Sequence, residues 1–300
     1  MASGCTSNDE TPLSTARSTV ISLPEGYKFF THQAGGHHHA QGGGKFGLLI
    51  DTKTSHVLKH LPYQHSQREA EFYDELAKEE NGGKQKWPSF IPRYYGKKLI
   101  KIGGTDHPFI ELDDFTAGLQ QPNILDVKLG GVNKKGDTPA RIAIRARKYP
   151  FYERLGFRLD GCKVYDPDSE TYLRLSAKTN KTEAELRRAV RIFLKCDDQD
   201  WNSAAIVESA RPQLQEIEKW LSTQTKWNFF SPSVLIAYDS IANCQQPETL
   251  RCRVAFVDFV HFYAADSIDA TCLRGLRNLI NFLHRQATTG EPEERLVGQG

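Results

Sequence analysis

Two charged residues share an otherwise apolar stretch, Pro122-Asn123-Ile124-Leu125-Asp126-Val127-Lys128-Leu129-Gly130. In a strand successive side chains point to opposite faces, so the apolar residues at 125, 127 and 129 would enter the core while Asp126 and Lys128 share the other face. A carboxylate and an ammonium on such a strand are costly if buried without partners. This segment alone predicts either an ion pair at a sheet edge or a functional site.

Three further residues suggest phosphate chemistry. Asp258 interrupts the apolar run Val254–His261. A lone buried carboxylate needs a compensating group such as a divalent cation, and the alternative is an Asp that caps the strand end. Upstream, Lys59 lies on an apolar strand, ten residues before Glu69 on a predicted helix. A strand lysine held by a helix glutamate, followed by an aspartate for metal, is the arrangement with which kinases handle phosphates.

A basic stripe follows the first motif. Arg141, Arg145 and Lys148 are spaced i, i+4 and i+7 in a segment predicted to be helical, so they share one face. Three such cations repel one another unless an anion is bound, and arginine suits bidentate phosphate contacts. A solvent-facing basic stripe is the alternative. Residues 126–163 carry ten basic and four acidic side chains, which favours a polyanionic partner.

The whole chain has the composition of a globular protein. Its 300 residues are 39% hydrophobic and 25% charged, with a net charge of +2, which excludes wholesale disorder. No apolar run approaches the roughly 20 residues of a membrane-spanning helix, and no secretory signal is visible. Six cysteines without a CxxC pair favour reduced thiols and a cytoplasmic or nuclear location. No zinc-finger, basic-zipper or RNA-binding signature occurs, so no nucleic-acid partner is expected.

The expected elements place these residues in an α+β chain of two lobes. Strands are expected at Lys45–Ile50, Ser55–His60, Phe109–Leu112, Ile124–Leu129, Ser233–Tyr238 and Val254–Phe259. Helices are expected at Gln67–Glu79, Pro139–Lys148, Glu183–Leu194, Ala204–Leu221 and Thr271–His284. Strands that cluster early and helices that come late predict a small antiparallel-sheet N-lobe, 27–115, and a larger α+β C-lobe, 116–288. Residues 1–26 and 289–300 are expected to be disordered tails.

Two absences narrow the class of kinase. The glycine-rich segment Gly43-Gly44-Lys45 is followed by Phe46 instead of Ser or Thr, so it is not a P-loop. The chain has no HRD-x-x-x-x-N catalytic loop and no DFG with an activation segment, which argues against an ordinary protein kinase. The layout therefore favours a kinase of small molecules.

Several motifs of the chain resemble those of a known family. PxxxDxKxG, met by Pro122, Asp126, Lys128 and Gly130, is the signature of the inositol polyphosphate kinase family. Further matches run in order from about residue 32 to residue 283. The segments, with the family's pattern in parentheses where it is a short motif, are His32–His37 (HQVAGH), Leu58–Leu61 with Arg68–Tyr73 (LKxL…RExxFY), Lys148–Pro150, Leu155–Phe157 and Gly161–Tyr165, Ser233–Leu235 (SLL), Val257–His261 (IDFAH) and Gly275–Ile280 (GLxxLI). The chain is most similar to the multikinase branch.

The resemblance implies a two-lobed, kinase-like fold with ATP between the lobes. Lys59 would hold the ATP phosphates, positioned by Glu69. The segment from Asp113 to Phe115 would be the hinge whose backbone meets adenine, and Asp126 would bind the ribose hydroxyls.

The resemblance also implies a magnesium and an acceptor site. Asp258 would ligate Mg²⁺, and Lys128 would bridge the γ-phosphate and the inositol phosphate. Lys128, Asp126 and Asp258 are therefore the expected catalytic residues. His261 would reach the substrate, on the same side as the stripe of Arg141, Arg145 and Lys148.

The activity implied is ATP-dependent phosphorylation of inositol tris- and tetrakisphosphates by a monomer, with phosphoinositide head groups as a further class of acceptor. Ile144 and Arg145 replace glutamines of the animal multikinase, which favours a more heavily phosphorylated inositol. One alternative is an inositol hexakisphosphate kinase that forms pyrophosphates. Another is a non-catalytic polyanion-binding scaffold, which predicts the loss of Lys59, Lys128 or Asp258, and all three are present.

Overall fold

The computed structural model describes residues 22–35, 46–83, 86–176, 182–199, 201–241 and 250–288. The expected tails fall largely on residues 1–21 and 289–300, outside this description. The start of the strand predicted from Lys45 and the end of the His32–His37 motif also lie outside it.

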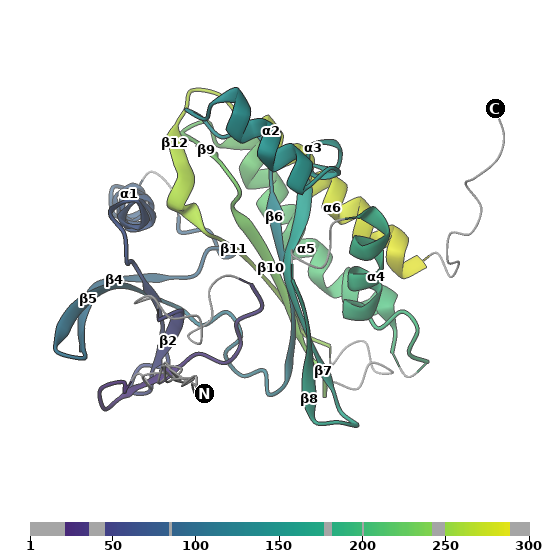
Figure 1. The fold of residues 1–300 in the computed structure, drawn as a ribbon, viewed down its shortest axis with the longest axis horizontal. Coiled ribbons are helices and arrows are strands. Elements are labelled where there is room, and N and C mark those ends of the chain that lie inside the picture. Colours follow the sequence, from purple (N-terminus) through teal and green to yellow (C-terminus); the bar gives the residue numbers. More distant parts are fainter. Residues whose placement is uncertain are drawn as a thin grey trace, which may run out of the picture.

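Two five-stranded antiparallel sheets organise the chain (Figure 1). The first has the order β1-β2-β3-β5-β4, with bounds Tyr27–Phe29, Leu48–Asp51, Val57–His60, Thr105–Leu112 and Tyr94–Ile102. The second has the order β11-β10-β6-β7-β8, with bounds Cys252–Val257, Ser233–Asp239, Pro122–Leu129, Phe157–Asp166 and Thr171–Ser176. A small third sheet pairs β9 (Trp227–Phe229) with β12 (Phe262–Ala264).

The helices gather around the second sheet. Three long helices cover one of its faces (Figure 1): α4 (Glu183–Phe193), α5 (Ser203–Thr223) and α6 (Ala270–Thr288). The short helices α2 (Pro139–Lys148) and α3 (Tyr152–Leu155) lie at one end of this sheet, and α1 (Gln67–Asn81) follows β3. None of the helices in the described ranges is both long enough and apolar enough to cross a membrane.

Helix α1 packs with the core of the second sheet. Its buried side chains Phe72, Tyr73 and Leu76 belong to the large hydrophobic cluster formed by that sheet and by α4, α5 and α6. The outer face of the first sheet has a separate, smaller cluster around Leu49 and Leu58. Close packing resists displacement, so α1 holds its polar residues in a fixed place relative to the second sheet.

The predicted α+β class is confirmed, as are all five predicted helices to within a few residues at their ends. The prediction that strands come early and helices late is wrong, because β7, β8, β10 and β11 alternate with helices in the second half. Strands β4 and β7 escaped prediction because lysines, acidic residues and glycines interrupt their apolar pattern.

Candidate active site

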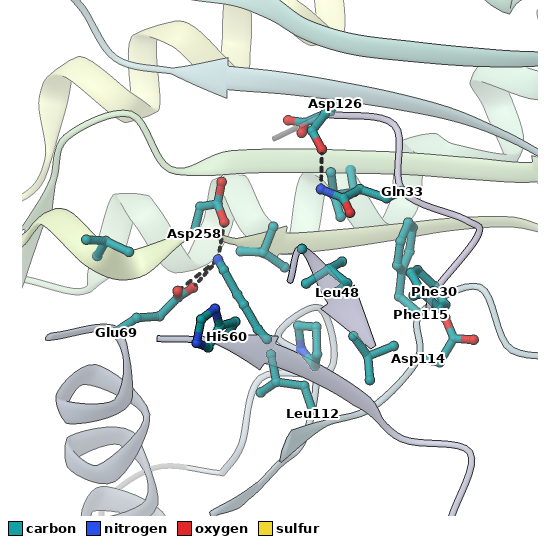
Figure 2. A pocket seen from close by; sticks show the side chains of 18 of the residues that line it. Phe30, Gln33, Leu48, His60, Glu69, Leu112, Asp114, Phe115, Asp126 and Asp258 are labelled. Atoms are coloured by element: carbon teal, nitrogen blue, oxygen red, sulfur yellow. Dashed lines mark hydrogen bonds and ion pairs between the residues drawn. The ribbon is translucent and has the colours of Figure 1, made fainter. Parts of the chain in front are cut away.

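A cleft of about 380 Å³ lies between the two sheets (Figure 2). Its apolar walls include Leu48 and Val57 from the first sheet and Leu235 from the second. Charged side chains, Glu69 and Asp258 among them, gather at one end, and the segment after β5 lies at the other (Figure 2). Flat apolar walls with a charged end suit a ligand that joins a planar ring to an anionic group.

The segment after β5 leaves two backbone groups for a ligand. The Asp113 amide donates to the Arg93 carbonyl at 2.9 Å, and the Asp113 carboxylate accepts from the Tyr95 hydroxyl. The Phe115 carbonyl accepts from Arg253 at 3.2 Å. Within the described ranges, the Asp113 carbonyl and the Phe115 amide have no hydrogen-bond partner. These two groups can pair with the edge of an aromatic base, as the predicted hinge requires.

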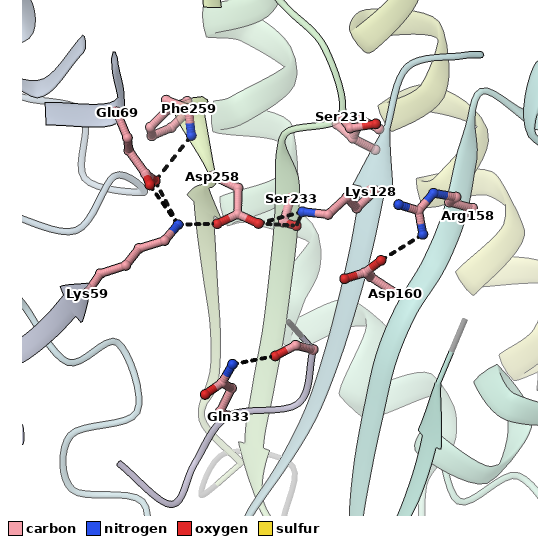
Figure 3. Close-up of polar contacts among 12 residues, drawn as sticks. Gln33, Lys59, Glu69, Lys128, Arg158, Asp160, Ser231, Ser233, Asp258 and Phe259 are labelled. Atoms are coloured by element: carbon pink, nitrogen blue, oxygen red, sulfur yellow. Dashed lines mark hydrogen bonds and ion pairs between the residues drawn. The ribbon is translucent and has the colours of Figure 1, made fainter. Parts of the chain in front are cut away.

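A chain of charged groups runs across the other end of the cleft (Figure 3). Lys59 Nζ on β3 donates to Glu69 Oε1 on α1 at 2.9 Å and to Asp258 Oδ1. Asp258 Oδ2 accepts from Lys128 Nζ on β6 at 2.5 Å. Lys128 Nζ is also 2.7 Å from Ser233 Oγ on β10. One carboxylate therefore bridges two lysines that come from opposite sheets.

These neighbours determine the charges of the group. Burial opposes ionisation of Asp258, but the ammonium groups of Lys128 and Lys59 hold its pKa well below the usual range. Burial likewise opposes the charged form of Lys59, yet Asp258 and Glu69 raise its pKa. Burial raises the pKa of Glu69, and Lys59 opposes that rise. Asp258 also raises the pKa of Lys128 against the effect of burial. Asp258 and both lysines are therefore charged at neutral pH.

Asp258 lies just beyond strand β11. The strand expected to continue to Phe259 ends at Val257, and Asp258 has the left-handed conformation φ 68°, ψ 59° before a 3₁₀ turn, Phe259–His261. The prediction of an Asp inside the strand is therefore wrong. Asp258 lies at the strand end, as in the alternative, but its side chain makes no capping hydrogen bond and pairs with Lys59 and Lys128 instead. Its buried neighbour Phe259 fixes this turn, because the Phe259 amide donates to Glu69 Oε1 at 3.2 Å. Such sparsely populated backbone conformations occur often at functional sites.

The alternation predicted for β6 is confirmed. Leu125, Val127 and Leu129 are buried in the large core, and Asp126 and Lys128 lie on the cleft side. Asp126 is 7% exposed, and its Oδ1 has no hydrogen-bond partner in the described part of the chain. Burial raises the pKa of Asp126 to about 7 against the effect of Lys128. Such an oxygen is suited to accept hydrogen bonds from a ligand.

A β-bulge brings another carboxylate beside Asp126. The register of β6 and β7 shifts at this point, so that Asp126 pairs with Gly161 and Val127 with Leu159. Asp160 is the additional residue, and it holds Arg158 at 2.7 Å (Figure 3). The negative charge of Asp160 contributes to the raised pKa of Asp126. A bulge commonly redirects a side chain near an active site.

The segment 31–35 closes the cleft beside Asp126. Lys163 Nζ donates to the Thr31 carbonyl at 2.8 Å, and Arg174 donates to the Gln33 carbonyl at 2.9 Å. A Cβ atom at Gly161 would collide with the backbone of Ala34. Glycine at this position is therefore needed for the segment to lie directly on β7.

The predicted acceptor residues lie on α2 and on the turn after Asp258. The side chain of Arg141 is 74% exposed, whereas Arg145 pairs with Asp137 at 2.6 Å and donates to the Val132 carbonyl. Lys148 Nζ lies 5.1 Å from the ring centroid of the adjacent tyrosine. His261 Nε2 is 3.3 Å from Lys134 Nζ. Burial, together with Lys134, lowers the pKa of His261 to about 4.

The structure brings Lys59, Glu69, Lys128 and Asp258 into one hydrogen-bonded chain, with Asp126 beside it. The predicted hinge residues, Asp113 and Phe115, line the opposite end of the same cleft. The stripe of Arg141, Arg145 and Lys148 lies on α2, without a direct contact to that chain in the described residues.

Sequence reasoning assigned no individual role to Ser233, Asp160 or Lys134, although Lys134 is one of the ten basic side chains of residues 126–163. Ser233 is visible in the sequence as the polar first residue of an apolar predicted strand. Only the register of β10 and β6 shows that it lies opposite Lys128. No sequence signal identifies Asp160, since its position depends on the bulge.

Comparison with known proteins is consistent with this geometry. Residues 109–284 match the model of a family described as inositol polyphosphate kinase. The chain is 30% identical over 276 residues to an inositol polyphosphate multikinase of Oryza sativa, covering 84% of this chain and 92% of that protein. It is 28% identical to the human inositol polyphosphate multikinase over 232 residues, covering 74% of this chain and 52% of that protein.

Solved structures share the fold. A crystal structure of the inositol phosphate multikinase Ipk2 of S. cerevisiae, in complex with ADP and Mn²⁺, superimposes with a TM-score of 0.58 at 18% identity. That match covers 76% of this chain and 98% of the yeast chain. A second inositol phosphate multikinase structure gives a TM-score of 0.54 at 22% identity and covers 73% and 99% of the two chains. The predicted two-lobed, kinase-like fold is confirmed.

Proposed function

The chain belongs to the inositol polyphosphate kinase family, and we propose that it transfers the γ-phosphoryl group of ATP to hydroxyls of soluble inositol phosphates. The observation that carries the proposal is Asp258 between Lys59 and Lys128. This arrangement places two cations and one carboxylate between the cleft, whose apolar walls suit a planar ring, and the cationic surface formed by α2 and the turn after Asp258. Transfer of a phosphoryl group requires this combination of positioning and charge neutralisation.

In this proposal the nucleotide fills the cleft between the sheets. Adenine pairs with the backbone of Asp113 and Phe115, and the unpartnered oxygen of Asp126 accepts from the ribose hydroxyls. Lys59, held by Glu69, binds the phosphates. The apolar walls and the two free backbone groups fit ATP, because they match its base and leave the charged end for its phosphates.

The residues present also fit a divalent cation. No group of three or more metal-ligating side chains occurs in the described ranges. Mg²⁺ needs no such group, because it is commonly held by one or two carboxylates together with substrate phosphates. We propose Asp258 as the protein ligand, with Lys59 and Lys128 turning to the phosphates. When bound, the cation would neutralise negative charge on the phosphates and so favour their transfer.

Lys128 has the central part in the transfer. Its Nζ lies 2.5 Å from Asp258 and 2.7 Å from Ser233, so its ammonium is held between the charged end of the cleft and the turn that carries His261, within reach of a phosphate bound at either place. We propose that it contacts the transferred phosphoryl group and an acceptor phosphate together. Because the transition state is loose, fixing both reactants supplies most of the catalysis.

The acceptor lies against the cationic surface formed by α2 and the turn after Asp258. We propose that Arg141 and Lys148 of α2, with His261, contact its phosphates, and that Arg145 acts by holding the loop before α2 through Asp137. The excess of cations here favours acceptors with many phosphates, which keeps inositol hexakisphosphate as a second candidate substrate. Phosphoinositide head groups carry the same chemistry and are the third class to test.

A turnover assay with magnesium and ATP tests the proposal. Inositol tris-, tetrakis-, pentakis- and hexakisphosphate are offered separately, and products are resolved by anion exchange. Conversion of the trisphosphate to the pentakisphosphate is the expected result. Conversion mainly of the hexakisphosphate would establish the pyrophosphate-forming alternative. If ATP binds and no acceptor is converted, the scaffold alternative holds and the proposed function is wrong.

We further propose a monomer that acts in the cytoplasm or the nucleus. Three of the four cysteines in the described ranges are buried, which fits reduced thiols in such a compartment. Sedimentation of the purified chain and imaging of a tagged copy in cells check the two statements.

A further inference from the structure

The loop between β6 and α2 carries a lysine that no motif predicted. Lys134 is half-buried, and its Nζ lies 3.3 Å from His261 Nε2. It also lies 6.0 Å from the ring centroid of Phe230, the ring over which Arg145 sits at 4.8 Å. An ammonium donates and never accepts, so His261 Nε2 accepts from Lys134 and the imidazole is neutral. This hydrogen bond holds the Lys134 side chain against the turn that follows Asp258.

The surroundings of Lys134 are cationic. Burial lowers its pKa, and the guanidinium groups of Arg145, Arg141 and Arg68 add to that effect. The opposing charge is Asp137, which is already paired with Arg145 at 2.6 Å. Lys134 has no ion pair with a carboxylate in the described ranges. Cations that gather without a matching carboxylate indicate a site for an external anion.

The neighbouring cations differ in how far they are already neutralised. Arg145 donates to Asp137 and to the Val132 carbonyl, and its side chain is 23% exposed. Its guanidinium is satisfied by the protein and braces the loop against α2. Lys134 donates only to a neutral imidazole. An arriving phosphate can therefore gain more from Lys134, because no ion pair has to be broken first.

We propose that Lys134 and His261 together bind one phosphate group of the acceptor, and that this pair, with Lys128, determines how the acceptor ring lies at the reaction centre. This inference rests on the proposed function. His261 is three residues after Asp258, in the same turn, so the bound phosphate lies next to the transferred group. Lys128 is the neighbouring cation on the reaction side. Lys134 is thus a specificity-determining residue, and Arg145 positions the loop that carries it.

Calorimetric titration of the full chain with inositol tris-, tetrakis- and hexakisphosphate, without nucleotide, tests this assignment. The hexakisphosphate has a phosphate at every ring position, so the test does not depend on which position Lys134 contacts. Lys134→Ala should weaken its binding roughly tenfold to a hundredfold, the usual value of hydrogen bonds to charged groups. Lys134→Arg should retain most of the affinity, since it preserves the charge. The affinity for ATP should not change.

Lys135→Ala is the matched control. Lys135 is exposed, lies 5.8 Å from the Tyr263 ring centroid, and its loss changes the net charge equally. It should weaken binding less than about threefold, as expected for an exposed charge. Turnover gives a second readout, because loss of phosphate binding raises the acceptor KM and loss of ring orientation also lowers kcat.

The outcomes separate the two proposals. If Lys134→Ala binds all three inositol phosphates within twofold of the wild type, or loses no more than Lys135→Ala, the assignment of Lys134 is overturned while the proposed function stands. If the wild type binds none of the three compounds and phosphorylates none, the proposed function fails and this inference fails with it. Thermal unfolding of each variant identifies a loss of affinity caused by unfolding.

Discussion

The nucleotide side and the acceptor side of the reaction centre balance their charges differently. On the nucleotide side, Lys59 is held by Glu69 and Asp258, and Glu69 is only 1% exposed. On the acceptor side, Arg141 is 74% exposed, and Lys134 faces a neutral histidine. The protein itself neutralises the first set of cations and leaves much of the second to its ligand.

This difference has a physical reason. A cation near the core of the molecule must have a carboxylate partner in the ligand-free state, because desolvating an unpaired charge is costly. A cation near solvent remains hydrated when no phosphate is bound, so it needs no carboxylate partner. Its contribution to the binding free energy of a phosphate is correspondingly smaller and more dependent on salt. Substitutions on the nucleotide side should therefore affect catalysis and stability, and those on the acceptor side mainly acceptor affinity.

The largest effects should come from the residues that join the two sides. Asp258→Asn and Lys128→Ala should each lower kcat by roughly 10²–10³-fold or more, the usual cost of removing one charge-stabilising group. Steady-state turnover measures this, and thermal unfolding confirms that each variant is folded. Asp266→Asn, an exposed aspartate after β12, is the control. Near-normal turnover of either variant would remove that residue from the active site.

A smaller effect on turnover is expected when the carboxylate that pairs with Lys59 is removed. Glu69→Gln removes the helix carboxylate from Lys59, so the KM for ATP should rise by roughly tenfold or more, since a hydrogen bond to a charged group is lost. The free energy of unfolding should fall by about 1–3 kcal/mol, measured by denaturant titration. Glu71→Gln, exposed on the same helix, is the control. Equal stability and ATP KM in both variants would contradict the pairing.

The pH dependence of nucleoside binding tests Asp126. Its pKa of about 7 means that the carboxylate is protonated below neutral pH, and only the ionised form accepts from two ribose hydroxyls. Affinity for adenosine, which has no phosphate to titrate, should therefore rise roughly tenfold between pH 6 and 8. Lys128, Asp160, Asp258 and Ser233 are the groups that face this carboxylate.

Asp126→Asn should bind adenosine with little change over the same pH range, because an amide does not titrate there. Fluorescence or calorimetric titration at several pH values gives the comparison. A wild-type affinity that falls as the pH rises, or an equal slope in the variant, would refute this role of Asp126.

The smallest effect is expected at the exposed end of the acceptor side. Arg141→Ala should raise the acceptor KM less than about fivefold, since exposed ion pairs contribute about 0.2–1 kcal/mol. Added salt should abolish the difference from the wild type. Arg147→Ala, exposed on α2 away from the stripe, is the control. A large decrease in kcat for Arg141→Ala would show that the acceptor side also stabilises the transition state.

Local pattern was sufficient for much of the fold. The alternation in 122–130 correctly predicted which side chains of β6 face the core and which face the cleft. The helical period correctly predicted α2 and the other four helices. Strands β4, β7 and β8 were missed, because edge and cleft-facing strands carry charged residues that hide their apolar pattern.

By itself, the sequence determined the residue types of the site, their order and the faces on which they lie, because those depend on neighbours a few positions away. Only the tertiary structure decided that Lys59 and Asp258, 199 residues apart, share a hydrogen bond. It also decided that a bulge turns Asp160 toward Asp126, and that Arg145 is paired while Lys134 is not. Register shifts, backbone turns and ion pairs depend on the packing of distant segments, and the periodicity of one segment contains no information about that packing.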